Sequence, residues 1–78
     1  MSREAHQNWI NQERRSIGNR VRRAREDANL TQEQLTFRTG VPRLTIQRIE
    51  SGATDARISW LLRIARALNI PLRSLLCE

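Results

Sequence analysis

Apolar residues recur along the chain at intervals of three and four, which places them on one face of an α-helix. The first such series consists of Ile17, Val21, Ala24 and Ala28. It predicts a helix that begins at about Asn11 or Glu13 and ends at Ala28. No segment bounded by turn residues alternates apolar and polar positions, so the sequence predicts no β-strand.

A second helix is predicted to begin after Thr31. The Thr31 hydroxyl can accept a hydrogen bond from the backbone of Gln34, and the Gln34 side chain can accept one from the backbone of Thr31. This reciprocal arrangement is a capping box. The helix is expected to end at Thr39, because the next residue, Gly40, readily adopts the left-handed conformation.

The third predicted helix follows almost at once. Pro42 favours an extended conformation at Val41 and has a fixed φ that suits the start of a helix. The helix is then expected to run from Arg43 to Ser51 and to end at Gly52. A very tight turn therefore joins two short helices.

Two further helices complete the pattern. After a loop at residues 53–56, a fourth helix carries apolar residues at helical spacing, namely Leu61, Ile64, Ala65 and Leu68, before a terminator at Asn69. A short fifth helix is predicted from about Leu72 to Cys77, with Pro71 at its start. Residues 13–78 are thus expected to form an all-α domain, a compact five-helix bundle. Residues 1–12 form an N-terminal segment that prolongs the first helix, packs as an arm or remains loose.

Charge indicates the class of partner. The 78 residues include fourteen arginines, no lysine and eight acidic residues, for a net charge of +6. A small domain this basic attracts polyanions through its long-range field and through counterion release. Nucleic acid is therefore the leading candidate partner.

The residues that other functions require are scarce. One cysteine, Cys77, and one histidine, His6, provide no disulfide and no metal cluster, so no metal or cofactor is expected. No glycine-rich phosphate loop and no nucleophile with a general base is found, so neither an enzyme nor a small-molecule ligand is expected. Apolar runs are too short to span a membrane, and no signal peptide is recognised, which favours a soluble cytoplasmic protein.

The third helix has an unusual outward face. If Ile46 and Ile49 point to the core, Leu44 points almost directly away from it, and Gln47 and Arg48 lie near Leu44. Arginine can bridge the acceptors of guanine, glutamine can bridge adenine, and an aliphatic tip can contact the methyl group of thymine. This combination favours insertion into the major groove of DNA.

Two segments together resemble a known family. "IGNRVRRAREDANLTQEQLTFRTGVPRLTIQRIESG", residues 17–52, and "ISWLLRIARALNIPLRSLL", residues 58–76, are similar to the XRE-type (Cro/C1-type) helix-turn-helix domain of phage repressors and small bacterial regulators. The resemblance covers every predicted helix. It implies a lambda-repressor-like fold, binding to double-stranded DNA, and a bacterial or phage origin.

The resemblance also implies roles for individual residues. Those expected to contact bases or adjacent phosphates from the third helix are Arg43, Leu44, Thr45, Gln47 and Arg48. Those expected to contact phosphates are Gln32, Thr54 and Arg57. Arg25 and Glu50 match an arginine and a glutamate that pair between the first and third helices, and we interpret the pair as structural.

Four residues depart from the family pattern. Thr36 and Thr39 replace small or apolar residues in the second helix, so their hydroxyls either loosen the packing or bond back to the chain. Pro42 replaces a capping serine or threonine, so the third helix is expected to begin without a side-chain cap. Ala56 replaces a common proline.

Apolar residues in excess of the core predict an oligomer. Ile58, Trp60 and Leu62 are expected to form a two-fold interface of a homodimer, which would place two recognition helices about one DNA turn apart, roughly 34 Å, on a pseudo-palindromic operator. Ordinary exposure of apolar side chains is the alternative. A protein-interaction module that has lost DNA binding, or a DNA-binding antitoxin that acts with a protein partner, is the alternative function.

Overall fold

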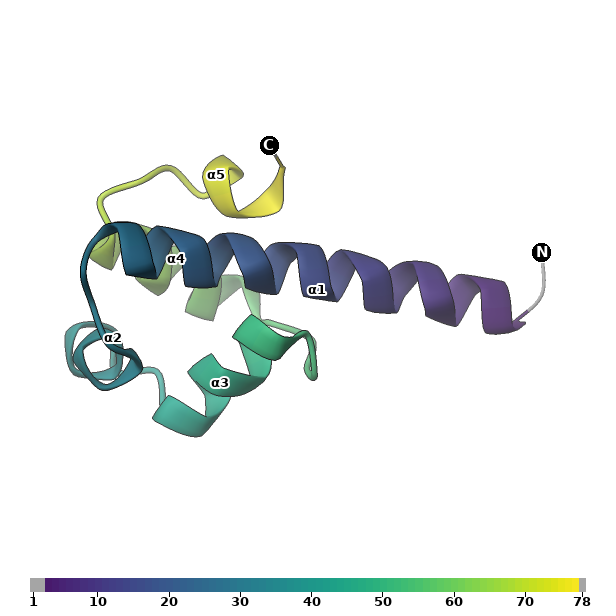
Figure 1. Cartoon of the computed structure of the whole chain (residues 1–78), viewed down its shortest axis with the longest axis horizontal. Coiled ribbons are helices and arrows are strands. Elements are labelled where there is room, and N and C mark those ends of the chain that lie inside the picture. The colour runs from purple at the N-terminus through teal and green to yellow at the C-terminus, as the bar shows by residue number, and fades with distance from the viewer. Residues whose placement is uncertain (1–2, 78) are drawn as a thin grey trace.

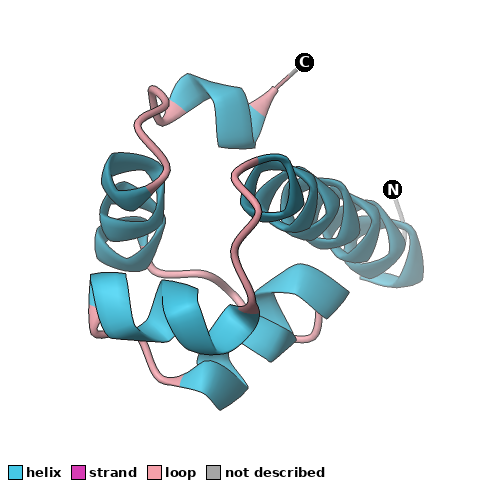
Figure 2. Cartoon of the chain, turned by 60° about the vertical axis from the view of Figure 1, so that its left-hand side comes forward, coloured by secondary structure: helices cyan, strands magenta, loops and turns pink. Residues whose placement is uncertain are grey.

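The computed structural model describes residues 3–77 and contains five helices and no strand within that range. They are α1 (Arg3–Asp27), α2 (Gln32–Thr39), α3 (Arg43–Ser51), α4 (Ile58–Ala67) and α5 (Arg73–Leu76). α3 and α5 lie on opposite sides of α1 (Figure 1). In Figure 2, α1 recedes from the viewer and the other four helices lie around its C-terminal half. The all-α, five-helix prediction is confirmed.

α1 is much longer than predicted. It begins at Arg3, so the expected start at Asn11 or Glu13 is wrong, and the N-terminal segment prolongs the helix. Residues 1 and 2 of that segment lie outside the described residues. The extension has a physical reason, because residues 3–16 contain no glycine or proline and several strong helix formers. It projects beyond the rest of the molecule (Figure 1).

Local hydrogen bonds fix both ends of α2 as predicted. The Thr31 hydroxyl accepts from the Gln34 amide at 3.1 Å, and the Gln34 side-chain oxygen accepts from the Thr31 amide at 2.8 Å. Gly40 ends the helix with a left-handed φ of 75°. The Thr39 hydroxyl donates to the carbonyl of Leu35 at 2.7 Å, so this side chain bonds back to the chain.

The remaining boundaries follow the sequence within one residue. Pro42 precedes α3 without a side-chain cap, as expected, and Gly52 ends α3 with a φ of 78°. Asn69, the expected terminator of α4, has a φ of 57°. α5 is shorter by one residue at each end than the predicted Leu72 to Cys77.

The core lies between α1 and the four shorter helices. It consists of Val21, Leu30, Leu35, Val41, Ile46, Ile49, Leu61, Ile64, Ala65 and Leu75. Most of these residues were predicted from helical spacing. Gly18 was not among the residues expected in the core, and it is buried where α1 packs against α3.

At Gly18 the backbones of α1 and α3 meet directly. A Cβ atom at this position would collide with the carbonyl oxygen of Ile49 and would lie 2.6 Å from that of Glu50. Backbone atoms cannot move aside as the tip of a flexible side chain can. Gly18 therefore sets how closely α3 approaches α1.

Gly18→Ala is expected to lower the free energy of unfolding by about 1 to 3 kcal/mol or more, because the methyl group forces two helices apart. Asn19→Ala is the matched control, since Asn19 is the exposed neighbour in the same helix. Urea unfolding followed by circular dichroism measures both. Equal stability of the two variants would show that the α1–α3 approach is not limited at Gly18.

Candidate nucleic-acid interface

α3 presents two distinct faces. Ile46 and Ile49 are buried in the core, whereas Leu44 on the opposite side is 54 % exposed. Arg43 and Arg48 are also exposed. The outward orientation expected from the spacing of α3 is therefore observed for these three residues.

The other two predicted base-contacting residues are less accessible. Thr45 and Gln47 are both half-buried. Gln47 lines a small hollow of about 240 Å³ at the junction of α1, α2 and α3. Gln47 thus lies at the edge of the exposed face rather than at its centre.

Arg43 is held by an acidic residue of α2. Its Nη1 atom lies 2.9 Å from Oε1 of Glu33, and both side chains are largely exposed. Exposed ion pairs of this kind contribute about 0 to 1 kcal/mol. A phosphate or a guanine can therefore displace Glu33 at little cost.

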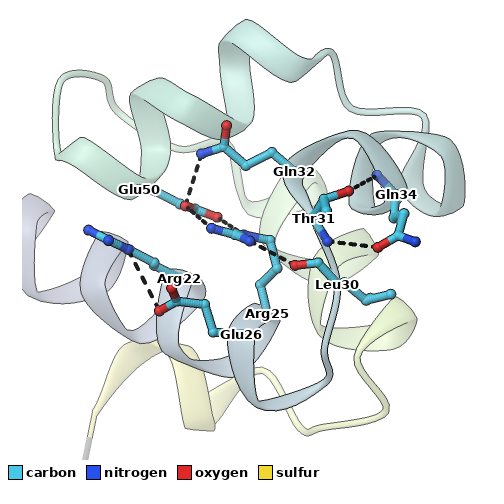
Figure 3. Close-up of polar contacts among 8 residues, drawn as sticks. All are labelled: Arg22, Arg25, Glu26, Leu30, Thr31, Gln32, Gln34 and Glu50. Carbon is cyan, nitrogen blue, oxygen red and sulfur yellow. Dashed lines mark hydrogen bonds and ion pairs between the residues drawn. The ribbon is translucent and has the colours of Figure 1, made fainter.

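Arg25 and Glu50 join α1 to α3 (Figure 3). Arg25 Nε donates to Glu50 Oε2 at 2.7 Å, and Nη2 donates to Oε1 at 3.0 Å, so the pairing is bidentate. The third nitrogen, Nη1, donates to the carbonyl of Leu30 at 2.7 Å. The exposed fractions are only 11 % for the Arg25 side chain and 5 % for that of Glu50.

These contacts keep the arginine charged. The hydrogen bond to Glu50 raises the pKa of Arg25 above its ordinary value, although burial acts in the opposite direction. Every nitrogen of the Arg25 guanidinium has an acceptor, which is the condition under which a buried ion pair holds a fixed geometry.

Gln32 belongs to the same network. Its side-chain amide donates to Glu50 Oε1 at 3.1 Å, so Glu50 receives bonds from both α1 and α2 (Figure 3). An amide nitrogen carries two hydrogens, and one of them remains for a further acceptor. Gln32 lies in the first turn of α2, where free backbone amides and the helix dipole favour an anion.

Arg22 is a residue that the sequence analysis did not assign. It lines the same hollow as Gln32 and Gln47, and its Nε lies 3.7 Å from the carboxylate of Glu26 in an exposed pair. Arg22 stands three positions before Arg25, so the two share a face of α1. That spacing relative to the predicted ion pair could have identified Arg22.

The loop between α3 and α4 is tied to α1. Arg14 donates through Nε to Oδ1 of Asp55 at 2.7 Å, and its Nη2 lies 2.6 Å from the same oxygen. Thr54 is half-buried beside this pair. The guanidinium of Arg57 lies 5.1 Å from the centre of the Trp60 ring, a cation–π contact that orients it.

The predicted dimer residues differ in exposure. Ile58 is 57 % exposed and Leu62 is 50 % exposed, whereas Trp60 is half-buried and packs in part against the core. Much of the Trp60 side chain therefore packs within the chain itself. Ile58 lines a hollow of about 360 Å³ together with Ile17 and Leu76, and this adds apolar surface beside Ile58 that the sequence analysis did not include.

No cluster of histidine, cysteine, aspartate or glutamate in residues 3–77 could hold a metal ion. None of the helices in that range is both long enough and apolar enough to cross a membrane.

Comparisons with known proteins agree with this geometry. The family model described as "Helix-turn-helix" matches residues 21–75. The structure is similar to the crystal structure of the restriction-modification controller protein C.AhdI from Aeromonas hydrophila, with a TM-score of 0.77 and 32 % sequence identity. The match covers 80 % of this chain and 94 % of that protein. Among curated protein sequences, none matches the chain.

Arg25→Ala is expected to lower the free energy of unfolding by about 3 to 5 kcal/mol, because it leaves Glu50 buried without its partner. Arg22→Ala is the matched control, since it removes an arginine from the same helix whose ion pair is exposed, and it is expected to cost less than about 1 kcal/mol. Thermal and urea unfolding measure both variants. If the two were equally stable, the Arg25–Glu50 pair would not be structural.

Proposed function

Because this chain belongs to the XRE-type helix-turn-helix family of DNA-binding transcriptional regulators, we propose that it recognises a specific double-stranded DNA sequence by inserting α3 into the major groove. The observation that carries this proposal is the outward face of α3. There Leu44, an apolar residue exposed at 54 %, lies outside the buried core and near the exposed Arg43 and Arg48.

Each residue on this face is suited to contact a particular group of a base or a phosphate. Arg48 and Arg43 are suited to the O6 and N7 acceptors of guanine or to a flanking phosphate, and Leu44 to the methyl group of thymine. Gln47, at the edge of the face, is suited to adenine. Thr45 supplies a hydroxyl that serves either a base or a phosphate.

Phosphate contacts would hold α3 in register. The free N–H of Gln32 and the first-turn amides of α2 form one anchor, and Arg22 beside them adds a positive charge. Thr54 and Arg57 form a second anchor at the other end of α3. The Trp60 ring restricts the Arg57 side chain, which lowers the entropy lost when it binds.

We further propose that the protein binds as a homodimer through the apolar surface of Ile58 and Leu62, with Ile17 and Leu76 next to it and Trp60 contributing its exposed part. A large exposed apolar surface commonly marks a contact with another protein. A two-fold axis here would present two copies of α3 to a pseudo-palindromic operator. Similarity to a controller protein favours control of restriction-modification genes over the role of a phage repressor or an antitoxin.

We infer that the chain regulates transcription by binding DNA and catalyses no reaction. Membership of a regulator family and the paired basic and apolar character of the α3 face both favour this over an enzyme. A protein-interaction module that has lost DNA binding is the competing function, and it is distinguished by its failure to select DNA.

Selection from a random duplex library at fixed salt, followed by sequencing, tests this function. The proposal predicts a common motif with two half-sites whose centres are about 10 base pairs apart. Enrichment of a single half-site would contradict the homodimer. If no common sequence emerged, the proposal of a sequence-specific regulator would fail.

Arg48→Ala is expected to cost about 1 to 3 kcal/mol of binding free energy on the selected duplex and much less on a scrambled one, since Arg48 is assigned to a base. Gln32→Ala is expected to weaken both duplexes to a similar extent, since Gln32 is assigned to a phosphate. Fluorescence anisotropy at one salt concentration measures the four affinities. Arg73→Ala, which removes an exposed arginine of α5, is the control for net charge. The assignment of Arg48 is contradicted by an equal loss on both duplexes.

Leu62→Ser is expected to raise the dissociation constant of the dimer about tenfold or more, because it removes a large apolar side chain from the proposed interface. Phe37→Ser is the matched control, since Phe37 is 91 % exposed on α2 and outside this surface. Sedimentation equilibrium measures the association of each variant. Two equal dissociation constants would place the interface elsewhere.

A further inference from the structure

A third hollow lies on the side of α1 that faces α5. Its volume is about 640 Å³, within the range of sites that hold small molecules. Its lining comes from three places along the chain: α1 with the residue after it, the connection between α4 and α5, and α5 with the residue after it. The lining residues are Arg20, Arg23, Ala24, Asp27, Ala28, Leu68, Ile70, Ser74 and Cys77.

Arg20 lines this hollow and has hydrogen-bond donors without acceptors. Its Nε and Nη1 atoms are buried, and neither has a hydrogen-bond partner among the described residues. A guanidinium that is shielded from water and lacks an acceptor is costly, so a rotation of the Arg20 side chain that brings these hydrogens to an anion in the hollow would lower that cost. By contrast, all three guanidinium nitrogens of Arg25 donate hydrogen bonds, to Glu50 and to the carbonyl of Leu30.

The charge of the lining also favours an anion. Arg23 adds a second guanidinium, and Asp27 is the one acidic residue among those that line the hollow in the described part of the chain. No ion pair within residues 3–77 engages Arg20 or Arg23. The lining therefore carries a surplus of positive charge, which raises the local concentration of anions.

We propose that this hollow binds a small organic oxyanion, a carboxylate or a phosphate monoester, with Arg20 as the principal donor. The Ser74 hydroxyl offers a further hydrogen-bond donor, and Ala24, Leu68 and Ile70 offer surface for a short apolar body. This departs from the expectation that no small-molecule ligand would be found. The arginine fork binds the two oxygens of such a group in a bidentate manner.

The site is separate from the proposed DNA interface. α5 and α3 lie on opposite sides of α1, so DNA held by α3 is on the far side of α1 from this hollow (Figure 1). Its ligand therefore does not have to compete with the DNA backbone. The proposal stands on the hollow and on Arg20, and it does not depend on the proposed function.

Inorganic phosphate is the probe, titrated against sodium chloride at constant ionic strength. A ligand that binds only the folded state raises the melting temperature as its concentration increases. Wild-type protein and Arg66→Gln, which removes an exposed arginine of α4 outside both this hollow and the proposed DNA interface, are expected to show the same increase. Arg20→Gln is expected to lose most of it, with an apparent affinity about tenfold weaker or more, because a charged hydrogen-bond donor is removed.

A second measurement needs no variant and applies if Arg20→Gln folds poorly. It follows the amide chemical shifts of the wild-type protein as phosphate is added. Phosphate is expected to shift the amides of residues 20–28 and 70–77 before those of α2 and α3. Equal losses in Arg20→Gln and Arg66→Gln, or shifts confined to α2 and α3, would indicate general attraction to a basic surface and overturn the proposal. If phosphate bound to Glu78→Gln but not to the wild type, the group that the hollow binds would be the Glu78 carboxylate. That result would overturn the proposal too.

Discussion

The bidentate ion pair between Arg25 and Glu50 is the interaction on which the rest of the structure depends. Glu50 is near the C-terminal end of α3, yet it accepts hydrogen bonds from α1 through Arg25 and from α2 through Gln32. Arg25 in turn holds the carbonyl of Leu30 at the turn that leads into α2. One pair of side chains therefore fixes three helices relative to one another. Such a pair specifies geometry more reliably than it adds stability.

The consequence of this arrangement is a helix with two different uses. The close approach at Gly18 and the pair at Glu50 bind one side of α3 to α1, while Ile46 and Ile49 enter the core. The side that remains is held in place without contributing to the core, so its residues are free to serve recognition. The same α1 presents Arg20 on the side of α5, where the structure offers no acceptor among the described residues.

The sequence predicted the helix ends that depend on neighbouring residues. It did not predict the contacts between residues that are far apart along the chain. The ends of α2 and α3 follow from a capping box and from two glycines, which act within a few residues. The predicted start of α1 is wrong because most residues of its extension are exposed, and an exposed helix needs no apolar face, although its composition favours a helix. A glycine inside a helix costs about 1 kcal/mol relative to alanine, and on that ground Gly18 could have been recognised as a packing position. The bond from Gln32 to Glu50 joins residues of separate helices, and no spacing in the sequence encodes it.

We propose that the outward face of α3, oriented by the Arg25–Glu50 pair, is the surface that binds DNA. Titration of isotopically labelled protein with a mixed-sequence duplex, followed by amide chemical shifts, tests this most directly, because it locates the contact before any operator is known. We expect the largest shifts in residues 43–48 and in the first turn of α2, with smaller ones in the loop at residues 53–57. The largest shifts in α4 and α5 or in the N-terminal extension of α1, with α3 unchanged, would contradict the assignment of this face to DNA.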